Sequence, residues 1–162
     1  MDTRLLHKIM FVWTAFFLSV SAVSCGAPEE TGAFVRSTGK DDGGNYRFSV
    51  DFGDSLCRYS LYFYTVIDAS TDDFDAMPRI IPLEVEAISP SGRLYGETVG
   101  IDKDSCMRRS SYSRQYESLY RNGFVPVEYG QWTFRVKVIG EEKFPGLRGL
   151  GLKSVPVPVE GS

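Results

Sequence analysis

Alternation between apolar and polar side chains is the feature that most limits the fold of this chain. In residues 46–52 (YRFSVDF) every second side chain is aromatic or aliphatic, and residues 131–138 (QWTFRVKV) repeat the pattern. Successive side chains of a strand point to opposite faces, so each segment predicts a β-strand with one buried face. No stretch shows a convincing helical period of about 3.6 residues. We therefore expect a fold that is built from strands.

The remaining apolar segments also have the composition of strands. Residues 58–67 (RYSLYFYTVI) are apolar or aromatic on both faces, which predicts a central strand that is covered on each side. Residues 104–120 are polar and rich in serine, and they could hold a helical turn. Three further strands are expected at residues 81–88, 93–101 and 149–155. Strands at this spacing without intervening helices predict an all-β fold, namely an antiparallel β-sandwich over residues 45–159.

The N-terminus has the pattern of a secretory signal peptide, which we place at residues 1–24. Two basic residues precede an apolar run at residues 9–20, and this run of 12 is shorter than a membrane-spanning helix, which needs about 20. Small residues then lead to Cys25, as in the lipobox of bacterial lipoproteins, whose cysteine is lipidated. The alternative is an ordinary secretory signal that is cleaved near Ser24.

A lipid on Cys25 would fix the protein to a membrane of the bacterial cell envelope, and we expect the outer membrane rather than the inner one. Acyl chains such as palmitate contribute about 0.8 kcal/mol for each buried methylene group. Residues 25–44 are rich in glycine and small polar side chains, which predicts a flexible tether between the lipid and the folded domain. The net charge of -3 gives no basic surface for nucleic acid.

The chain has one histidine, His7, and this residue lies inside the predicted signal peptide. Cleavage before Cys25 would leave a chain without an imidazole group. Catalytic triads that use histidine, and zinc or haem sites that depend on it, are then excluded. Paired carboxylates could still serve a glycosidase, but no spacing singles out a pair. We expect a protein that is not an enzyme and that needs neither a cofactor nor a metal.

Two cysteines besides Cys25 belong to the predicted domain. Cys57 and Cys106 could form a disulfide, because an envelope protein is exposed to an oxidising compartment. They could equally be two small buried thiols. The sequence does not decide between these alternatives, since it does not show which residues are close in space.

Aromatic residues supply the candidate contact sites. Tyr62 and Tyr64 are two positions apart in a predicted strand, so they share one face. That face could be covered by a loop or by a partner protein, or it could offer stacking surfaces to sugar rings. Tyr59 and Trp132 lie on apolar faces, and we expect them in the core.

Two charged clusters have less specific patterns. Four aspartates lie within residues 68–75 and could donate oxygens to calcium, but their spacing does not fit an EF-hand loop, and we expect a solvated acidic loop. Four arginines lie within residues 108–121 and could meet an anionic partner, although solvated loop positions explain them equally well. These are Arg108, Arg109, Arg114 and Arg121.

Four segments, together with the lipobox, occur in an order that is typical of one known family. Residues 91–96 (SGRLYG) match a G-x-W-x-G turn and strand, and residues 129–134 (YGQWTF) match a G-x-Y-x-F strand. Residues 145–153 (PGLRGLGLK) match a closing segment, and residues 59–64 (YSLYFY) match a Y-x-L-Y-L strand. In these features the chain resembles the gliding-motility lipoproteins of the GldH family. The resemblance implies an envelope-anchored, non-enzymatic component of the gliding or associated secretion machinery of Bacteroidota-type bacteria.

The sequence thus favours a lipid-anchored scaffold or accessory protein of the cell envelope. Its expected partners are the membrane, through the lipid on Cys25, and other envelope, motility or secretion proteins. The alternative function is a surface glycan-binding or adhesion module that uses Tyr62 and Tyr64.

Overall fold

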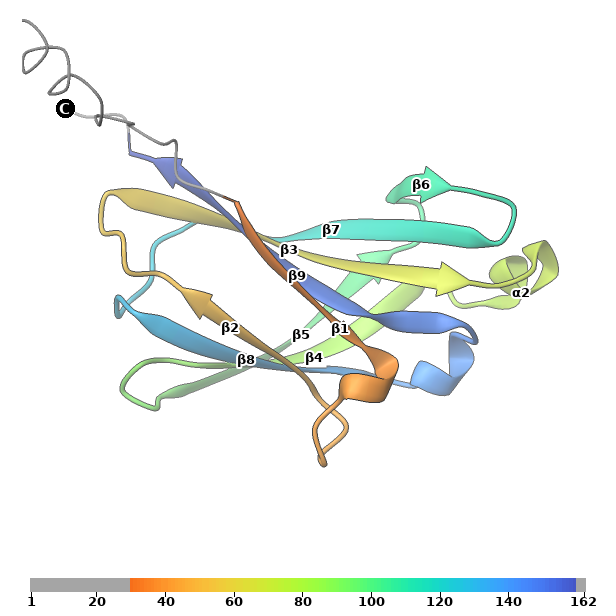
Figure 1. Cartoon of the computed structure of the whole chain (residues 1–162), viewed down its shortest axis with the longest axis horizontal. Coiled ribbons are helices and arrows are strands. Elements are labelled where there is room, and N and C mark those ends of the chain that lie inside the picture. Colours follow the sequence, from red (N-terminus) through yellow and green to blue (C-terminus); the bar gives the residue numbers. More distant parts are fainter. Residues whose placement is uncertain (1–29, 160–162) are drawn as a thin grey trace, which may run out of the picture.

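The computed structural model describes residues 30–159, which form a β-sandwich of two antiparallel sheets (Figure 1). One sheet has five strands in the order β1-β9-β3-β7-β6, and the other has four strands in the order β2-β8-β4-β5. The predicted all-β sandwich is confirmed. The signal peptide, Cys25 and the first residues of the predicted tether lie outside the described residues. Within residues 30–159, the structure contains no helix with the length and apolar character needed to cross a membrane.

All six strands that the sequence predicts are present, and three more complete the sheets. The five-stranded sheet contains β1 (Thr31–Arg36), β9 (Leu147–Pro158), β3 (Cys57–Asp68), β7 (Ser113–Phe124) and β6 (Cys106–Arg109). The four-stranded sheet contains β2 (Tyr46–Asp51), β8 (Gln131–Val138), β4 (Ile80–Ile88) and β5 (Leu94–Asp102). Three short helical segments connect the strands, namely η1 (Ser37–Gly39), α2 (Thr71–Ala76) and η2 (Glu141–Lys143).

The core lies between the sheets and is made by alternate side chains of both. On β2 and β8, the register sets Phe48 opposite Phe134 and Val50 opposite Trp132, and all four side chains are buried. Burial of a large apolar side chain contributes about 1.5–3 kcal/mol. Tyr59 is also buried, so the predicted core positions of Tyr59 and Trp132 are confirmed. The period of two in the sequence thus becomes two layers that meet along one apolar interface.

The prediction of a tether that extends to residue 44 is wrong in its C-terminal part. β1 pairs with β9 in the antiparallel direction, starting with Thr31 opposite Ser154. Val35 is half-buried and packs against the core. The sheet satisfies backbone groups of β1 that a free tether would expose to water. The folded domain therefore already includes Thr31 and does not start at residue 45.

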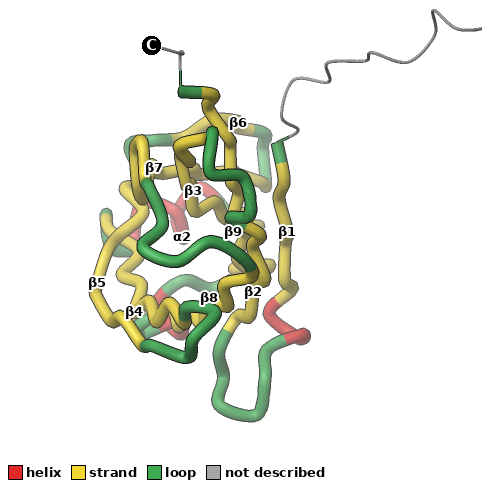
Figure 2. The backbone as a smooth tube through the Cα atoms, turned by 90° about the vertical axis from the view of Figure 1, so that its left-hand side faces the viewer, coloured by secondary structure: helices red, strands yellow, loops and turns green. Residues whose placement is uncertain are grey.

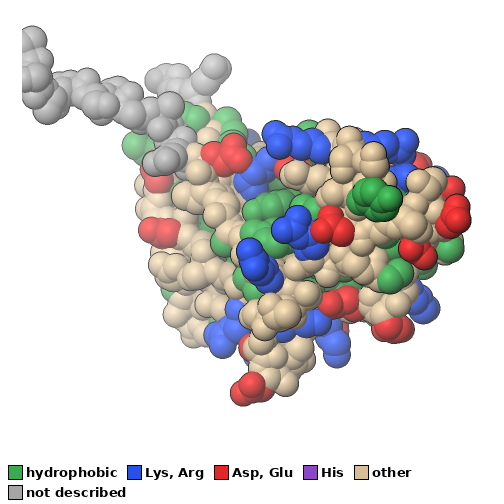
Figure 3. All heavy atoms as spheres, turned by 45° about the vertical axis from the view of Figure 1, so that its right-hand side comes forward, with side chains coloured by type: hydrophobic (Ala, Val, Ile, Leu, Met, Phe, Trp, Pro, Cys, Tyr) green, Lys and Arg blue, Asp and Glu red, His purple; other side chains and the backbone are tan. Residues whose placement is uncertain are grey.

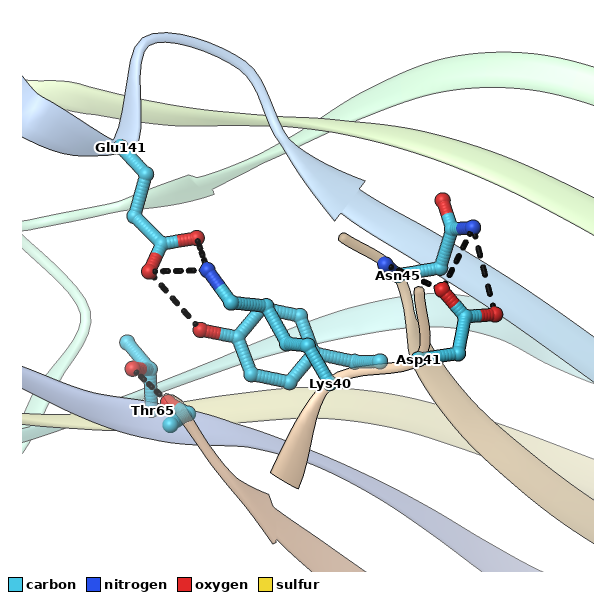
Figure 4. Close-up of polar contacts among 7 residues, drawn as sticks. Lys40, Asp41, Asn45, Thr65 and Glu141 are labelled. Carbon is cyan, nitrogen blue, oxygen red and sulfur yellow. Dashed lines mark hydrogen bonds and ion pairs between the residues drawn. The ribbon is translucent and has the colours of Figure 1, made fainter. Parts of the chain in front are cut away.

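Polar contacts also hold the connection between β1 and β2 (Figure 4). The Nζ atom of Lys40 lies 2.9 Å from a carboxylate oxygen of Glu141, and the Tyr46 hydroxyl donates to the same carboxylate at 3.1 Å. Burial and the charge of Glu141 raise the pKa of Tyr46. The Asp41 carboxylate accepts a hydrogen bond from the backbone N–H of Asn45 at 2.9 Å, and this bond lowers the pKa of Asp41. Residues 40–46 are thus part of the folded domain.

Residues 104–120 contain β6 and most of β7, and the helical turn that they could have held is absent. Tyr116 of β7 pairs with Thr65 of β3, and both side chains are buried. Leu119, Tyr120 and Phe124 are the other large apolar side chains of β7, and most of its remaining residues are polar. Its strand conformation therefore depends on pairing with β3, which the local composition does not reveal.

Cys57 and Cys106 are both free thiols, so a disulfide between them is ruled out in this fold. Cys57 begins β3, whereas Cys106 pairs with Tyr116, which in turn lies opposite Thr65. The strand from Cys57 to Thr65 spans about 26 Å, whereas the Cα atoms of a disulfide are roughly 4.4–6.8 Å apart. The Cys57 thiol donates instead to the Asp54 carboxylate at 3.2 Å.

Candidate functional site

The predicted contact residues Tyr62 and Tyr64 lie on the outer face of the five-stranded sheet. β3 is the middle strand of this sheet, as predicted, but its outer side is only half-buried within residues 30–159. Exposed or half-buried aliphatic and aromatic side chains from β1 and β7 lie on the same face, together with one ion pair. We call this surface the aromatic face, and it comprises Phe34, Tyr62, Tyr64, Glu117, Leu119, Gly151 and Lys153.

The ring of Tyr64 lies flat on the sheet because its neighbour on β9 is a glycine. Gly151 is opposite Tyr64 on one side and opposite Phe34 on the other. A Cβ atom on Gly151 would lie 2.1 Å from the Cζ atom of Tyr64, so any larger residue would displace the ring. The Tyr64 and Phe34 rings stack with centroids 5.8 Å apart and planes inclined by 27°. Burial raises the pKa of Tyr64.

A partly buried ion pair lies beside the stacked rings. The Nζ atom of Lys153 is 2.9 Å from a Glu117 carboxylate oxygen, 3.7 Å from a Glu30 oxygen and 4.6 Å from the centre of the Tyr62 ring. Burial alone would lower the pKa of Lys153, but the hydrogen bond to Glu117 and its charge raise it above the usual value. Lys153 is therefore a fixed cation between an aromatic ring and two carboxylates.

These side chains surround an open depression of about 370 Å³ on the aromatic face. Its lining residues are Glu30, Gly32, Tyr64, Gln115, Glu117 and Lys153. An aromatic surface next to hydrogen-bond donors and acceptors can hold a partner side chain or a sugar ring, since both need an apolar contact and oriented polar groups. The structure thus brings Tyr64 together with polar groups from three other strands or segments.

The outer face of the four-stranded sheet differs in composition, and we call it the polar face. Arg135 and Glu86 form an ion pair at 2.9 Å, and Glu84 lies opposite Lys137. Its polar outward residues include Arg47, Ser49, Glu84, Glu86, Thr98, Thr133, Arg135 and Lys137, and the apolar side chains of Ile80, Ile88 and Leu94 lie at its ends. This face has the usual character of a solvated sheet surface.

A second concave site, which the sequence analysis missed, opens between β5 and β7. This lateral cleft has a volume of about 220 Å³ and an apolar, largely aromatic lining. Tyr95 is 42% exposed and stacks on Trp132 with ring centroids 5.7 Å apart. Its aromatic lining residues are Tyr95, Tyr120, Phe124, Trp132 and Phe134. One signal in the sequence was Glu97, a carboxylate that shares its strand face with the apolar residues Tyr95, Val99 and Ile101.

Polar groups close one side of the lateral cleft. The Tyr120 hydroxyl donates to the Glu97 carboxylate at 2.6 Å, and Arg121 forms an ion pair with the same carboxylate. Burial, followed by the hydrogen bond to Glu97, raises the pKa of Tyr120. These contacts join the edge of one sheet to the other sheet, so the groups around the cleft satisfy one another.

The charged clusters do not form sites of the kinds that the sequence left open. The acidic segment contains α2, where Ser70 caps the helix by accepting a hydrogen bond from the backbone N–H of Asp73 at 3.2 Å. The segment is thus a short helix and not a loop. Among residues 30–159, no group of three or more histidine, cysteine, aspartate or glutamate side chains is arranged to hold a metal ion.

The arginines of residues 108–121 separate into two places. Arg109 lies opposite Arg114, whose guanidinium group is 3.9 Å from the centre of the Phe74 ring. Arg121 lies at the lateral cleft and pairs with Glu97. The predicted basic patch therefore does not include Arg121.

No protein-family model matches this chain, and no curated protein matches it by sequence. Solved structures with a similar fold include a protein from Sulfurospirillum deleyianum, with 9% identity over 83% of this chain and 100% of that chain and a TM-score of 0.42. The mitogen of Yersinia pseudotuberculosis is 10% identical over 83% of this chain and 87% of its own, with a TM-score of 0.29. A carbohydrate-binding module of the β-sandwich superfamily is 12% identical over 77% of this chain and 51% of its own, with a TM-score of 0.28. Similarity at this level supports no functional conclusion.

Proposed function

We propose that this protein is a non-enzymatic, lipid-anchored component of a bacterial cell envelope, which binds a partner protein through its aromatic face. Cys25 carries the lipid, and the outer membrane is the proposed location. The partner is another envelope protein, and the resemblance to the GldH family makes a gliding or associated secretion machinery the proposed setting.

The observation that carries the proposal is the composition of the aromatic face. Leu119 is 50% exposed and Phe34 is 38% exposed, and Tyr62 and Tyr64 lie half-buried between them. Contiguous apolar surface rimmed by polar groups is typical of protein interaction sites. The pair of Lys153 and Glu117 adds an oriented donor and acceptor at the edge of the apolar area.

The lipid anchor is tested by fractionation of cells that express the full chain. Replacement of Cys25 with Ser should move the protein from the membrane fraction to the soluble fraction. An unchanged distribution would show that Cys25 is not the anchor.

Partner binding is tested by cross-linking and co-purification in mild detergent, with two matched variants. Leu119→Glu places a charge on the aromatic face, whereas Ser49→Glu places one at an exposed position of the polar face. We expect Leu119→Glu to lose the envelope proteins that co-purify with the parent, and Ser49→Glu to retain them. Equal retention by both variants would contradict the proposed interface.

A second candidate function is glycan binding at the same face. It is favoured by the flat, stacked pair of Tyr64 and Phe34, because a sugar ring packs its apolar face on an aromatic ring and hydrogen-bonds at its edge. Glu117, Gln115 and Lys153 supply such edge groups around the depression.

Glycan-array binding separates the two candidates. Binding by the parent protein that disappears in a Tyr62→Ala, Tyr64→Ala double variant would favour the glycan-binding function. Thermal unfolding of the same variant provides the control, because a loss of binding counts only if the domain remains folded. Absence of binding by the parent would leave the protein partner as the proposal.

A further inference from the structure

Exposed apolar side chains gather at one end of the sandwich. This end, which we call the rim end, contains the β2–β3 loop, the β7–β8 loop and the end of β9 (Figure 1). Leu56 is 75% exposed, Val127 is 71% exposed and Val159 is 49% exposed. Val125 and Val157 are exposed there as well. We call these five residues the apolar rim.

Backbone hydrogen bonds hold the segments of the apolar rim together. The N–H of Val159 donates to the carbonyl oxygen of Leu56 at 2.9 Å. Phe52 and Gly130 exchange two backbone hydrogen bonds, at 2.9 and 3.3 Å, which joins the loop before β3 to the loop before β8. Figure 2 looks onto this end and shows these loops in front of the two sheets. The apolar side chains are therefore carried by adjoining segments.

The position of β1 relates the rim end to the proposed lipid. Thr31, the first residue of β1, lies opposite Ser154, only four residues before the end of β9. The chain from Cys25 to Thr31 can span at most about 22 Å, even when fully extended. Ser154 also lies opposite Leu61 of β3, which is about 13 Å from the rim end of that strand and about 23 Å from its α2 end. A lipid on Cys25 would therefore favour the nearer rim end for contact with the bilayer.

We infer that the apolar rim docks on the bilayer into which the Cys25 lipid inserts. This inference rests on the proposed lipidation of Cys25. The transfer of exposed leucine and valine side chains from water into the interfacial region of a membrane lowers the free energy. The rim thus gives the domain a second contact with the bilayer, in addition to the lipid on Cys25. Two contacts fix the orientation of the domain.

The other surfaces of the domain are less suited to this contact. At the α2 end, Met107 is 62% exposed and Tyr112 is 73% exposed, but fewer large apolar side chains are exposed there than at the rim end. Figure 3, with this end turned forward, shows acidic and basic side chains interspersed between separate hydrophobic patches. On the aromatic face, Leu119 lies near the Lys153–Glu117 ion pair. The docked orientation also leaves the aromatic face free for a partner.

Tryptophan quenching by brominated lipids tests the docked orientation. The lipidated protein, which begins at Cys25 and therefore lacks Trp13, is reconstituted into vesicles of phosphatidylethanolamine and phosphatidylglycerol, in which a fraction of the lipids carries bromine on the acyl chains. A tryptophan is introduced by Leu56→Trp or Val127→Trp on the rim, by Leu119→Trp on the aromatic face, or by Met107→Trp at the α2 end. Trp132 gives a constant background, because it is buried in the core.

We expect the added fluorescence of Leu56→Trp and Val127→Trp to be lost in brominated vesicles, and that of Leu119→Trp and Met107→Trp to persist. Vesicle-bound protein without quenching at either rim position would overturn the docking inference but leave the anchor intact. Stronger quenching of Leu119→Trp or Met107→Trp would also overturn it, in favour of another orientation. Protein that does not sediment with the vesicles would overturn both the anchor and the docking.

Discussion

The two sheets of this sandwich have outer faces of opposite character. On the polar face, alternation leaves mainly charged and hydroxyl side chains outside, with Arg135 and Glu86 in a partly exposed ion pair. On the aromatic face, the same alternation places Tyr62 and Tyr64 outside, and Gly151 lets the Tyr64 ring lie on the strand. Both faces fit a stable fold, so stability alone does not explain the difference. This difference is the basis on which we propose the aromatic face as the site of partner contact.

Two glycines, one on each face, give the largest expected contrast. Gly151→Val would place its side chain on the Tyr64 ring, whereas a Cβ atom on Gly96 would have no heavy atom of another residue within 4 Å, its two chain neighbours aside. We expect Gly151→Val to lower the free energy of unfolding by about 1–3 kcal/mol because of overpacking. Gly96→Val should leave it unchanged or slightly higher, because valine favours strands. Urea-induced unfolding measures both values.

A third variant shows whether the Tyr64 ring is the cause. In a Tyr64→Ala background the ring is absent, so Gly151→Val should cost much less than in the parent. An equal cost in both backgrounds would show that the flat position of Tyr64 does not depend on Gly151.

The ion pairs of the two faces provide the next contrast. The side chains of Lys153 and Glu117 are 21% and 18% exposed, whereas those of Arg135 and Glu86 are 35% and 40% exposed. Because solvent screens the first pair less, its coupling energy should be about 1 kcal/mol, and that of the second pair about 0.3 kcal/mol. Double-mutant cycles with Lys153→Met and Glu117→Gln, and with Arg135→Met and Glu86→Gln, measure both couplings. Equal couplings would mean that the two faces are equally solvated.

Alkaline pH should reveal the smallest effect. Burial raises the pKa of Tyr64 above its ordinary value of 10.0, so the folded state favours the neutral hydroxyl. The resulting stabilisation is present below about pH 10 and is lost as the pH rises through the folded-state pKa. Tyr64→Phe should therefore weaken the decline of the unfolding free energy at alkaline pH. It should not abolish the decline, because Tyr46 and Tyr120 also have raised pKa values.

Chemical denaturation on both sides of pH 10 provides the measurement for Tyr64→Phe. A variant whose alkaline decline matches that of the parent would contradict the buried environment assigned to the Tyr64 hydroxyl.

The sequence predicted the strands whose own residues alternate, and it missed those that depend on a partner. β2 and β8 carry large apolar side chains at every second position, so their buried faces are evident from the sequence. β1 contains glycine and alanine where a strong strand signal would need larger side chains, and it is ordered by pairing with β9. β7 is mostly polar and is ordered by β3 in the same way.

The candidate site was predictable only in part, for the same reason. The shared face of Tyr62 and Tyr64 follows from a spacing of two residues within one strand. Their contacts with Phe34, Glu117 and Lys153 come from three other strands, and the lateral cleft likewise combines β5 with β7. A single strand does not encode which neighbours the register sets beside it.

The sequence by itself determined the all-β class, the inward positions of Tyr59 and Trp132 and the shared strand face of Tyr62 and Tyr64. These follow from the period of two, which is a local property of an extended chain. The tertiary structure decided that Thr31 already belongs to the sheet, that Cys57 and Cys106 lie far apart, and that one outer face is aromatic. Each of these depends on strand order and register, which arise only when distant segments share a common core.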